Sequence, residues 1–481
     1  MSARRFVIKL QREEVVDFMK IAVFFIGRKR PGFDLEWGEF LKQEIQTHLG
    51  RLPFETLVFY SVSDERAMRE AIISAKRNGV QVVIVSQPTM GDGNLWPILL
   101  SDWDGGIIVW ATPENPQSTK VSACGLVGAH NWVSGMSQAG RPPYLVYGRP
   151  NDPVTVKELH NAVLAAKTTV KLQHARIGLI GDHAPGFLNM AVDAATMQQI
   201  LGPRLKRFGL HEFIGVMLSF DDDEVAEDRR QAESFGLPVR EGVTLTDDVW
   251  NISSRYYLAL RKLVDEESLD AVALRCWPEL PNEFGVWPYL AVARLLSDGV
   301  NICEEGDVDG AIGCLIAQSL GCETVYNSDW LEHDDDHIQL WHAGATPWGI
   351  CEPIGTPKGP TLATHFNSGK PLVVDAELWN GTPVTLFRLW RMGSRYRMAI
   401  CEGHVVEPTR IIEGCAGRVR VSGGGEGALR PATTVRKFFV DACTAGMPHH
   451  LTVMKGHYAD PLEQFAALYQ PQPIDVILRI G

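Results

Sequence analysis

Short apolar runs alternate with helix-like stretches from residue 21 onward. The runs IAVFFIG (21–27), TLVFYSV (56–62) and VQVVIVSQ (80–87) are separated by amphipathic segments over 36–49 and 64–78. Parallel strands are covered on both faces, so they read as nearly continuous apolar runs joined by crossover helices. The alternation therefore predicts βαβ units and a doubly wound, Rossmann-like parallel sheet.

The same alternation returns further along and then gives way to another pattern. A second αβ unit begins with RIGLIG (176–181) and includes a long helix over about 249–265 and the strand DAVALRCW (270–277). After Trp341, short strand-like runs are separated by Gly and Asn turns, which favours a mainly β, barrel-like fold. We predict an α/β chain of three domains: an N-terminal αβ domain over 1–155, a second αβ domain over 156–340 and a mainly β C-terminal domain over 341–481.

Composition excludes several classes of protein. The 481 residues carry a net charge of −12 without a long Lys/Arg run, so nucleic acid and anionic membranes are poor partners. The nine cysteines include no CxxC pair, which favours a reducing compartment over a disulfide framework. No apolar run approaches the roughly 20 residues that span a bilayer. We expect a cytoplasmic protein with a small-molecule substrate.

One acidic stretch, within NICEEGDVDGAIGCLIAQSL (301–320), follows a strand predicted over 300–303. A second predicted strand, over 323–326, also runs toward an acid, Asp329. In an open parallel sheet, ligands bind beyond the carboxyl ends of the strands, and neighbouring strands lie only about 5 Å apart. We therefore expect Glu305 and Asp329 to face the same small volume.

Two carboxylates that share a small volume repel each other unless a cation lies between them. A hard divalent cation is the simplest explanation for such a pair. Asp307 or Asp309 can cap the next helix. The alternative to a cation site is that the acids of the stretch form only a solvated, capping-rich loop. Spacing alone does not separate these two interpretations.

The histidines also allow both a structural and a metal-binding interpretation. Most single histidines in proteins have structural roles, and the HExxH and HxxxH metal patterns are absent here. The run from Glu332 to His337 is best interpreted as a solvated turn, because consecutive loop residues cannot all face one ion. The adjacent pair His449 and His450 is more unusual, and a strand is predicted to deliver it ahead of a final strand and helix.

A family resemblance rests on these motifs. Glu305-Gly306-Asp307 precedes Gly310-Ala311, the acid Asp329 follows after the next strand, and Pro448-His449-His450 stands near the end with Gly456-His457 after it. The chain thus resembles the L-fucose isomerase and L-arabinose isomerase group of aldose–ketose isomerases, most closely the fucose isomerase branch. The resemblance covers most of residues 20–470 in domain order, with specific motifs only in the second and third domains.

The resemblance implies a set of metal ligands. Glu305, Asp329 and His450 match the family's first glutamate, second acid and C-terminal histidine, and Glu304 is the alternative ligand if the loop register shifts by one. Two carboxylates and one imidazole leave open positions on an octahedral cation for two adjacent sugar oxygens. Mn²⁺ is the expected cofactor, with Mg²⁺ or Co²⁺ as alternatives.

The resemblance also implies substrate-binding residues. Arg30 matches an arginine that reaches the substrate of a neighbouring subunit, so a homo-oligomer with shared active sites, a trimer or hexamer, is expected. Trp96 is expected to replace an aromatic residue that this chain lacks at Pro88. His449 is a candidate for substrate contact. His342 either lines the site or braces a domain junction.

These observations predict a metal-dependent aldose–ketose isomerase in which Glu305 or Asp329 moves a proton between C2 and C1 through a cis-enediol. The family implies this proton transfer, whereas the sequence itself does not separate it from a hydride shift. Candidate substrates are a 6-deoxyhexose, a pentose or a C6-modified hexose; a sulfonated C6 would suit the cations at 28–30. Two other functions remain open: a non-catalytic sugar-binding or sensor protein, and a metal-dependent hydrolase or lyase.

Overall fold

The computed structural model describes residues 19–27, 33–422, 434–469 and 472–481. The chain divides into two compact units, residues 1–167 and 168–481, and each is described by itself. The division of the chain into three domains stays a prediction. None of the described helices is both long and apolar enough to span a membrane.

The first unit contains a parallel sheet, as predicted. Among the described residues its strands follow the order β2-β1-β3-β4-β5, and every neighbouring pair is parallel. This order reverses direction between β1 and β3, as in a doubly wound fold. The strands are β1 (Met19–Ile26), β2 (Phe54–Val62), β3 (Val82–Ser86), β4 (Gly106–Ala111) and β5 (Tyr144–Tyr147).

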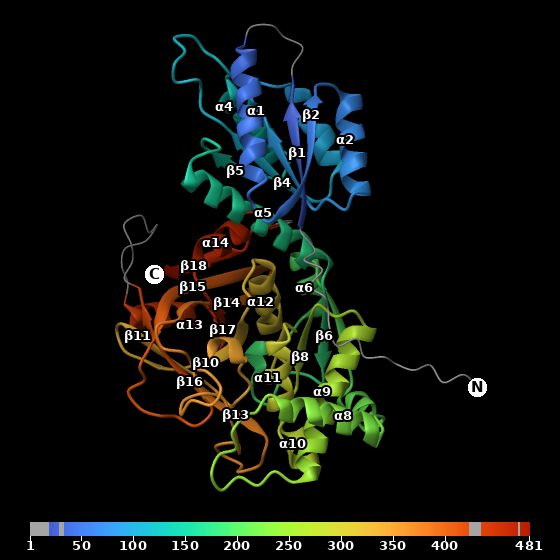
Figure 1. The fold of residues 1–481 in the computed structure, drawn as a ribbon, viewed down its shortest axis with the longest axis vertical. Helices are drawn as coiled ribbons and strands as arrows, with labels where there is room; N and C mark the ends of the chain where they lie inside the picture. The colour runs from blue at the N-terminus through green and yellow to red at the C-terminus, as the bar shows by residue number, and fades with distance from the viewer. Residues whose placement is uncertain (1–18, 28–32, 423–433, 470–471) are drawn as a thin grey trace, which may run out of the picture. The chain divides into compact units, whose positions relative to one another are not determined.

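Helices connect these strands and bury their apolar faces against the sheet (Figure 1). Asp34 and Asp64 accept hydrogen bonds from backbone N–H groups of the first turns of α1 and α2, which fixes where the two helices begin. The helices are α1 (Leu35–Leu49), α2 (Glu65–Arg77), α3 (Trp96–Asp102), α4 (Gly125–Gln138) and α5 (Pro153–His174), the last of which runs into the second unit.

The second unit combines a parallel sheet with a larger β sheet. The parallel sheet has the order β7-β6-β8-β9, from β6 (Arg176–Ile180), β7 (Arg204–Phe208), β8 (Ala271–Leu274) and β9 (Ile302–Cys303). Its helices are α6 (Ala194–Leu201), α7 (Leu210–Leu218), α8 (Asp222–Ser234), α9 (Asp247–Glu266), α10 (Glu279–Phe284), α11 (Tyr289–Ser297) and α12 (Val308–Ser319). The fold class predicted from the sequence is confirmed.

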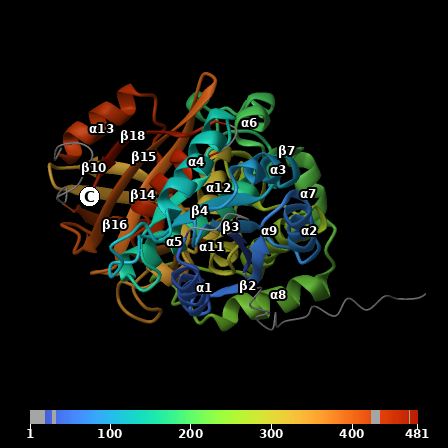
Figure 2. The same ribbon diagram turned by 90° about the horizontal axis from the view of Figure 1, so that it is seen from above.

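The larger sheet has the order β12-β13-β16-β11-β10-β17-β14-β15-β18 in the described part of the chain. A further pairing between β15 and β16 closes its middle strands into a barrel-like ring. Figure 2 shows these strands from above. They are β10 (Val325–His333), β11 (His337–His342), β12 (Thr361–Ala363), β13 (Val373–Glu377), β14 (Pro383–Met392), β15 (Arg395–Val406), β16 (Cys415–Val421), β17 (His450–Lys455) and β18 (Asp475–Ile480).

Strand β10 differs from the prediction in its pairing. The run at 323–326 was expected to be the next parallel strand after β9, with Asp329 beyond its tip. Instead β10 pairs antiparallel with β11 and β17, and Asp329 lies within it. The physical reason is local: a short turn joins β10 to β11, and such a connection permits only antiparallel pairing.

Helix α12 joins the two sheets of the second unit. It packs against β8 of the parallel sheet and against β14 and β17 of the larger sheet (Figure 1). The approach to β17 is close, because a Cβ atom on Gly313 would lie 2.4 Å from Thr452 Oγ1. One hydrophobic core extends across both sheets.

The C-terminal segment differs in one element from the prediction. Residues Val435–Thr444 form a helix, α13, and not a strand, so a helix and a turn lead to the His449-His450 pair. His450 then opens β17, which is followed by α14 (Ala459–Ala467) and β18. The alternation VRKFFVDACT has an apolar face at helical spacing as well, and this face packs on the sheet.

Candidate active site

The turn after β9 holds Glu305 in an unusual backbone conformation. Glu305 has φ +62° and Gly306 has φ +70°, and the first value is uncommon for a residue with a side chain. Two backbone hydrogen bonds hold the turn: Ala184 N donates to Glu305 O at 2.8 Å, and Gly306 N donates to Leu274 O at 2.9 Å. Strained backbone that its surroundings hold in place is typical of functional sites.

The Glu305 carboxylate faces three aromatic side chains. Trp277 Nε1 donates to Oε1 at 2.9 Å, while Oε2 lies 3.6 Å from His449 Nε2 and 3.4 Å from His450 Nε2. Burial alone would raise the pKa of Glu305, but the two imidazoles outweigh it and hold the pKa well below its ordinary value. Glu305 is therefore an anion ready to bind a cation.

Asp329 reaches the same imidazoles from β10. It lies directly opposite His450 in the pairing of β10 with β17. Its Oδ1 is 3.6 Å from His450 Nε2 and 3.7 Å from His449 Nε2. The structure thus brings together the three residues expected as metal ligands, although Asp329 arrives from the middle of an antiparallel strand.

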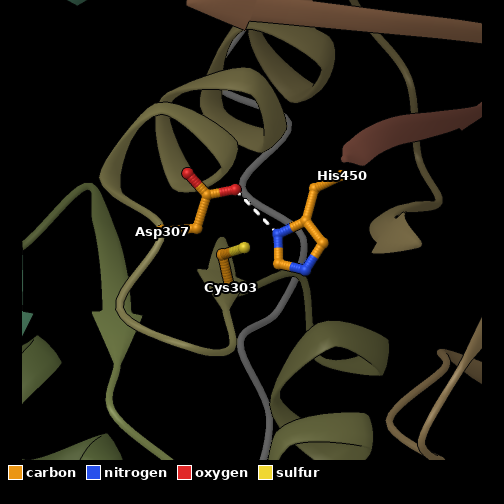
Figure 3. A group of neighbouring side chains, drawn as sticks. All are labelled: Cys303, Asp307 and His450. Atoms are coloured by element: carbon orange, nitrogen blue, oxygen red, sulfur yellow. Dashed lines mark hydrogen bonds and ion pairs between the residues drawn. The ribbon is translucent and has the colours of Figure 1, made fainter. Parts of the chain in front are cut away.

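His450 is fully buried and is held from behind by Asp307 (Figure 3). Its Nδ1 lies 2.8 Å from Asp307 Oδ2. Burial would lower the pKa of His450, but its contacts with Asp307 and Glu305 raise it to about 10. Arg388 and His450 in turn hold the pKa of the buried Asp307 far below its usual range.

Cys303 lies beside this pair, and Figure 3 shows its thiol close to Asp307 and His450. The spacing of the three side chains would suit a metal, but Arg388 donates to both Asp307 oxygens, at 2.5 and 2.9 Å. A guanidinium already supplies the positive charge there. A cation therefore fits better on the other side of His450, where Glu305, His449 and His450 form a second group with ligand spacing.

Several buried polar atoms on that side have no hydrogen-bond partner in the described structure. Buried nitrogen and oxygen atoms normally find partners, so each exception needs an explanation. The unpartnered atoms in and around this group are Glu304 Oε1 and Oε2, Glu305 Oε2, Asp329 Oδ1, His342 Nδ1 and His450 Nε2. All are ligand atoms that divalent cations accept, so the donor set fits a bound metal ion.

Glu304 and His342 lie next to the ligand group. Glu304 is only 1% exposed, and burial raises the pKa of its carboxyl group. His342 Nδ1 is 4.0 Å from Glu304 Oε1, and the His342 ring centroid lies 5.6 Å from that of His450. Both residues thus lie beside the ligand group, while the role of Glu304 as an alternative ligand and that of His342 stay predictions.

Some neighbours of the site were missed from the sequence. Phe187 packs against His449 with ring centroids 4.5 Å apart and meets Trp277 edge to face at 6.1 Å. The Trp277 contact with Glu305 had no sequence signal. Arg388 had a sequence signal, because it stands within the apolar run LFRLW and a charged residue is almost never fully buried unless it is paired.

Two substrate-binding candidates belong to the first unit. Arg30, with Arg28 and Lys29, lies outside the described residues. Trp96 opens α3 and lines a cavity of about 410 Å³ together with residues of the β3–α3 loop and α4. A contribution of either residue to the active site stays a prediction.

The acidic run after Trp330 behaves as a surface turn. Asp334 accepts hydrogen bonds from the backbone N–H groups of Asp336 and His337, at 2.8 and 2.7 Å, inside the β10–β11 hairpin. Its carboxylate also lies 3.0 Å from His337 Nδ1 and 2.9 Å from Arg418 Nη2. The structure agrees with the interpretation of this run as a solvated turn.

Comparison with known proteins points to one class of enzyme. The chain is 23% identical to the sulfoquinovose isomerases of Priestia aryabhattai and Priestia megaterium over 441 residues, which cover 91% of this chain and 94% of each relative. The sulfoquinovose isomerase of Alkalicoccus urumqiensis is 22% identical over 82% of this chain and 88% of its own. No protein-family model matches the chain.

Solved structures add little. The periplasmic binding protein component of the arabinose ABC transporter from Shewanella sp. ANA-3 is 10% identical over 63% of this chain and 84% of its own, with a TM-score of 0.17. So low a TM-score supports no inference about fold or function.

The relatives indicate that the chain is an isomerase, and they support a sugar isomerase family for it. Every one of these relatives is named a sulfoquinovose isomerase. An enzyme is thus indicated in place of a sensor, and an isomerase in place of a hydrolase or lyase. The narrower resemblance to L-fucose and L-arabinose isomerases stays a prediction.

Proposed function

We propose that the chain is a metal-dependent aldose–ketose isomerase that acts on a C6-sulfonated hexose such as sulfoquinovose. The proposal of a bound metal rests on one observation. The buried, unpartnered oxygens of Glu305 and Asp329 lie 3.4 and 3.6 Å from the equally unpartnered Nε2 of His450. The substrate class is supported by the names of relatives that align over nearly the whole chain.

Glu305, Asp329 and His450 would hold the cation, with Mn²⁺ as first choice and Mg²⁺ or Co²⁺ as alternatives. When bound, the ion would polarise the sugar carbonyl and stabilise negative charge that develops beside it. Glu305 and Asp329 are the carboxylates available to take the proton from C2 and return it to C1. This sequence of proton transfers passes through a cis-enediol.

The remaining side chains would orient the sugar. His449 is 32% exposed at its side chain, so its ring is available to a sugar hydroxyl, in contrast to the buried His450. Trp277 and Phe187 offer apolar ring surface beside it. The cations at 28–30 are candidates for the sulfonate. By the family resemblance, we also propose a homo-oligomer, a trimer or hexamer with shared sites, which light scattering after size exclusion would test.

The test is turnover in deuterated water, read by NMR. The EDTA-treated protein is incubated with sulfoquinovose, glucose or L-fucose, with and without Mn²⁺. We expect ketose only with Mn²⁺, fastest from sulfoquinovose, and with solvent deuterium at C1. Ketose without deuterium would indicate a hydride shift. Preference for a neutral sugar would refute the proposed sulfonated substrate. Equal activity without Mn²⁺ after EDTA treatment would refute the metal dependence.

A further inference from the structure

We propose that Asp307 and Arg388 form a clamp that holds a proton on His450 Nδ1, so that Nε2 is the nitrogen that loses its proton and binds the metal. The proposal rests on the metal site proposed above. It makes Asp307 and Arg388 positioning residues for the reaction.

The clamp is built from side chains on three elements. Asp307 is the N-cap of α12, Arg388 lies in β14 and His450 opens β17. Asp307 and Arg388 are each 1% or less exposed, and so is His450. Solvent therefore cannot substitute for any contact within the group.

The hydrogen bonds of Asp307 have one possible direction. Oδ1 accepts from Gly310 N at 3.0 Å and from Arg388 Nη2 at 2.9 Å, and Oδ2 accepts from Arg388 Nη1 at 2.5 Å. Arginine has five donors, no acceptor and a permanent charge, so the fork keeps Asp307 as a carboxylate. A carboxylate can only accept, so His450 Nδ1, 2.8 Å from Oδ2, must be the donor.

The consequence appears at the other nitrogen of the ring. With Nδ1 protonated, Nε2 is the atom left for a metal ion, and it is the one that faces Glu305 Oε2 and Asp329 Oδ1. A metal-bound histidine usually donates its other N–H to a carboxylate or carbonyl, and loss of that partner typically costs 10- to 100-fold in metal affinity. Here the partner is itself held by an arginine.

Asp307→Asn tests this direction with almost no change in shape. In the variant the amide oxygen is expected at the Oδ1 position, because the backbone N–H of Gly310 and Arg388 Nη2 both require an acceptor there. The amide nitrogen then lies at the Oδ2 position, where it donates to His450 Nδ1 and Arg388 Nη1 loses its acceptor. The proton moves to Nε2, which makes Nε2 unfit as a ligand.

The experiment uses the full chain with ¹⁵N-labelled histidine, and His450→Gln assigns the signals. We expect His450 Nδ1 to show a protonated nitrogen in the parent protein and an unprotonated one in Asp307→Asn. Mn²⁺ titration by EPR or calorimetry should show about 10- to 100-fold weaker binding by the variant. Asp309→Asn, two residues along the same helix and without a hydrogen bond to His450, is the matched control and should bind Mn²⁺ within about twofold of the parent.

A protonated Nδ1 in Asp307→Asn, or Mn²⁺ affinity equal to that of the parent, would overturn the proposal. If the parent binds no Mn²⁺, the proposed function fails, while the nitrogen signals still decide the tautomer. If Asp307→Asn does not fold, Arg388→Lys decides instead, because a lysine cannot hold both oxygens at once. We then expect at least about tenfold weaker Mn²⁺ binding, and parent-like affinity would again refute the clamp.

Discussion

Asp329 and His450 lie directly opposite each other on β10 and β17, and Asp329 Oδ1 is 3.6 Å from His450 Nε2. Antiparallel pairing sets this distance, since opposed residues of neighbouring strands project from the same face. The loop that carries Glu305 then brings a second carboxylate to the same nitrogen, at 3.4 Å.

Loss of either carboxylate should weaken metal binding and turnover. We expect Glu305→Gln and Asp329→Asn each to lower Mn²⁺ affinity at least about tenfold and to abolish deuterium incorporation, with the fold intact. Glu304→Gln is the comparison that tests the alternative ligand, because Glu304 is buried next to Glu305 and its Oε1 lies 4.0 Å from His342 Nδ1. A larger effect at Glu304 than at Glu305 would move the ligand role to Glu304.

Gly306→Ala should disturb the site through the backbone. A Cβ at Gly306 would lie 2.3 Å from Asp182 O, a backbone atom that cannot move alone, and φ is +70°. We expect a loss of well over about 1 kcal/mol in the free energy of unfolding, with weaker Mn²⁺ binding because the turn at Glu305 shifts. Gly285→Ala is the control: φ is also +70°, but no atom lies within 4 Å of the added Cβ, so only the smaller conformational cost remains. Equal melting temperatures of the two variants would contradict the argument.

His365 predicts a pH dependence of stability. Burial, with the nearby His342, lowers the pKa of His365 to about 4. Its ring stacks on Trp287 at 3.9 Å, and its Nδ1 accepts from two backbone N–H groups. In the unfolded chain the pKa is about 6.5, so the unfolded state binds the proton more tightly between these values and stability falls as pH decreases.

The protonation of His365 should lower the free energy of unfolding by about 3 kcal/mol near pH 4. The measurement compares parent and His365→Gln by thermal unfolding at pH 7.5 and pH 5. We expect the parent to be the more stable at pH 7.5 and the difference to shrink at pH 5. A difference that stays constant with pH would mean that His365 does not titrate in this range.

The buried ion pair of Asp228 and Arg294 should be costly to break on one side. Arg294 donates to both carboxylate oxygens at 2.8 and 2.7 Å, and both side chains are at most 3% exposed. We expect Asp228→Leu to cost about 3 to 5 kcal/mol, because it leaves a buried charge unpaired. The double variant Asp228→Leu/Arg294→Met should recover much of that loss in denaturant unfolding, whereas a double variant no more stable than Asp228→Leu would show that the unpaired Arg294 charge is not the cause of the loss.

Much of the fold could be predicted because local patterns determine it. Buried parallel strands and their helices have distinct periodicities, and turns rich in Gly and Asn mark the larger sheet. The segment over Val435–Thr444 was missed because a short apolar run suits a strand or a helix equally well, and packing decides between them. The contacts of Trp277 and Arg388 join positions far apart in the chain, so no local pattern contains them.

The sequence alone determined which residue types were available: paired acids near 305, an acid at 329 and a histidine pair at 449–450, on an α/β scaffold followed by β strands. Only the tertiary structure decided how they meet. Asp329 reaches His450 through cross-strand pairing rather than at a parallel strand tip, and Asp307 caps α12 as expected but is buried against Arg388 and His450 instead of lying in a solvated loop. The physical reason is that strand pairing and the burial of charge depend on partners 81 to 143 residues away along the chain, which local spacing does not encode.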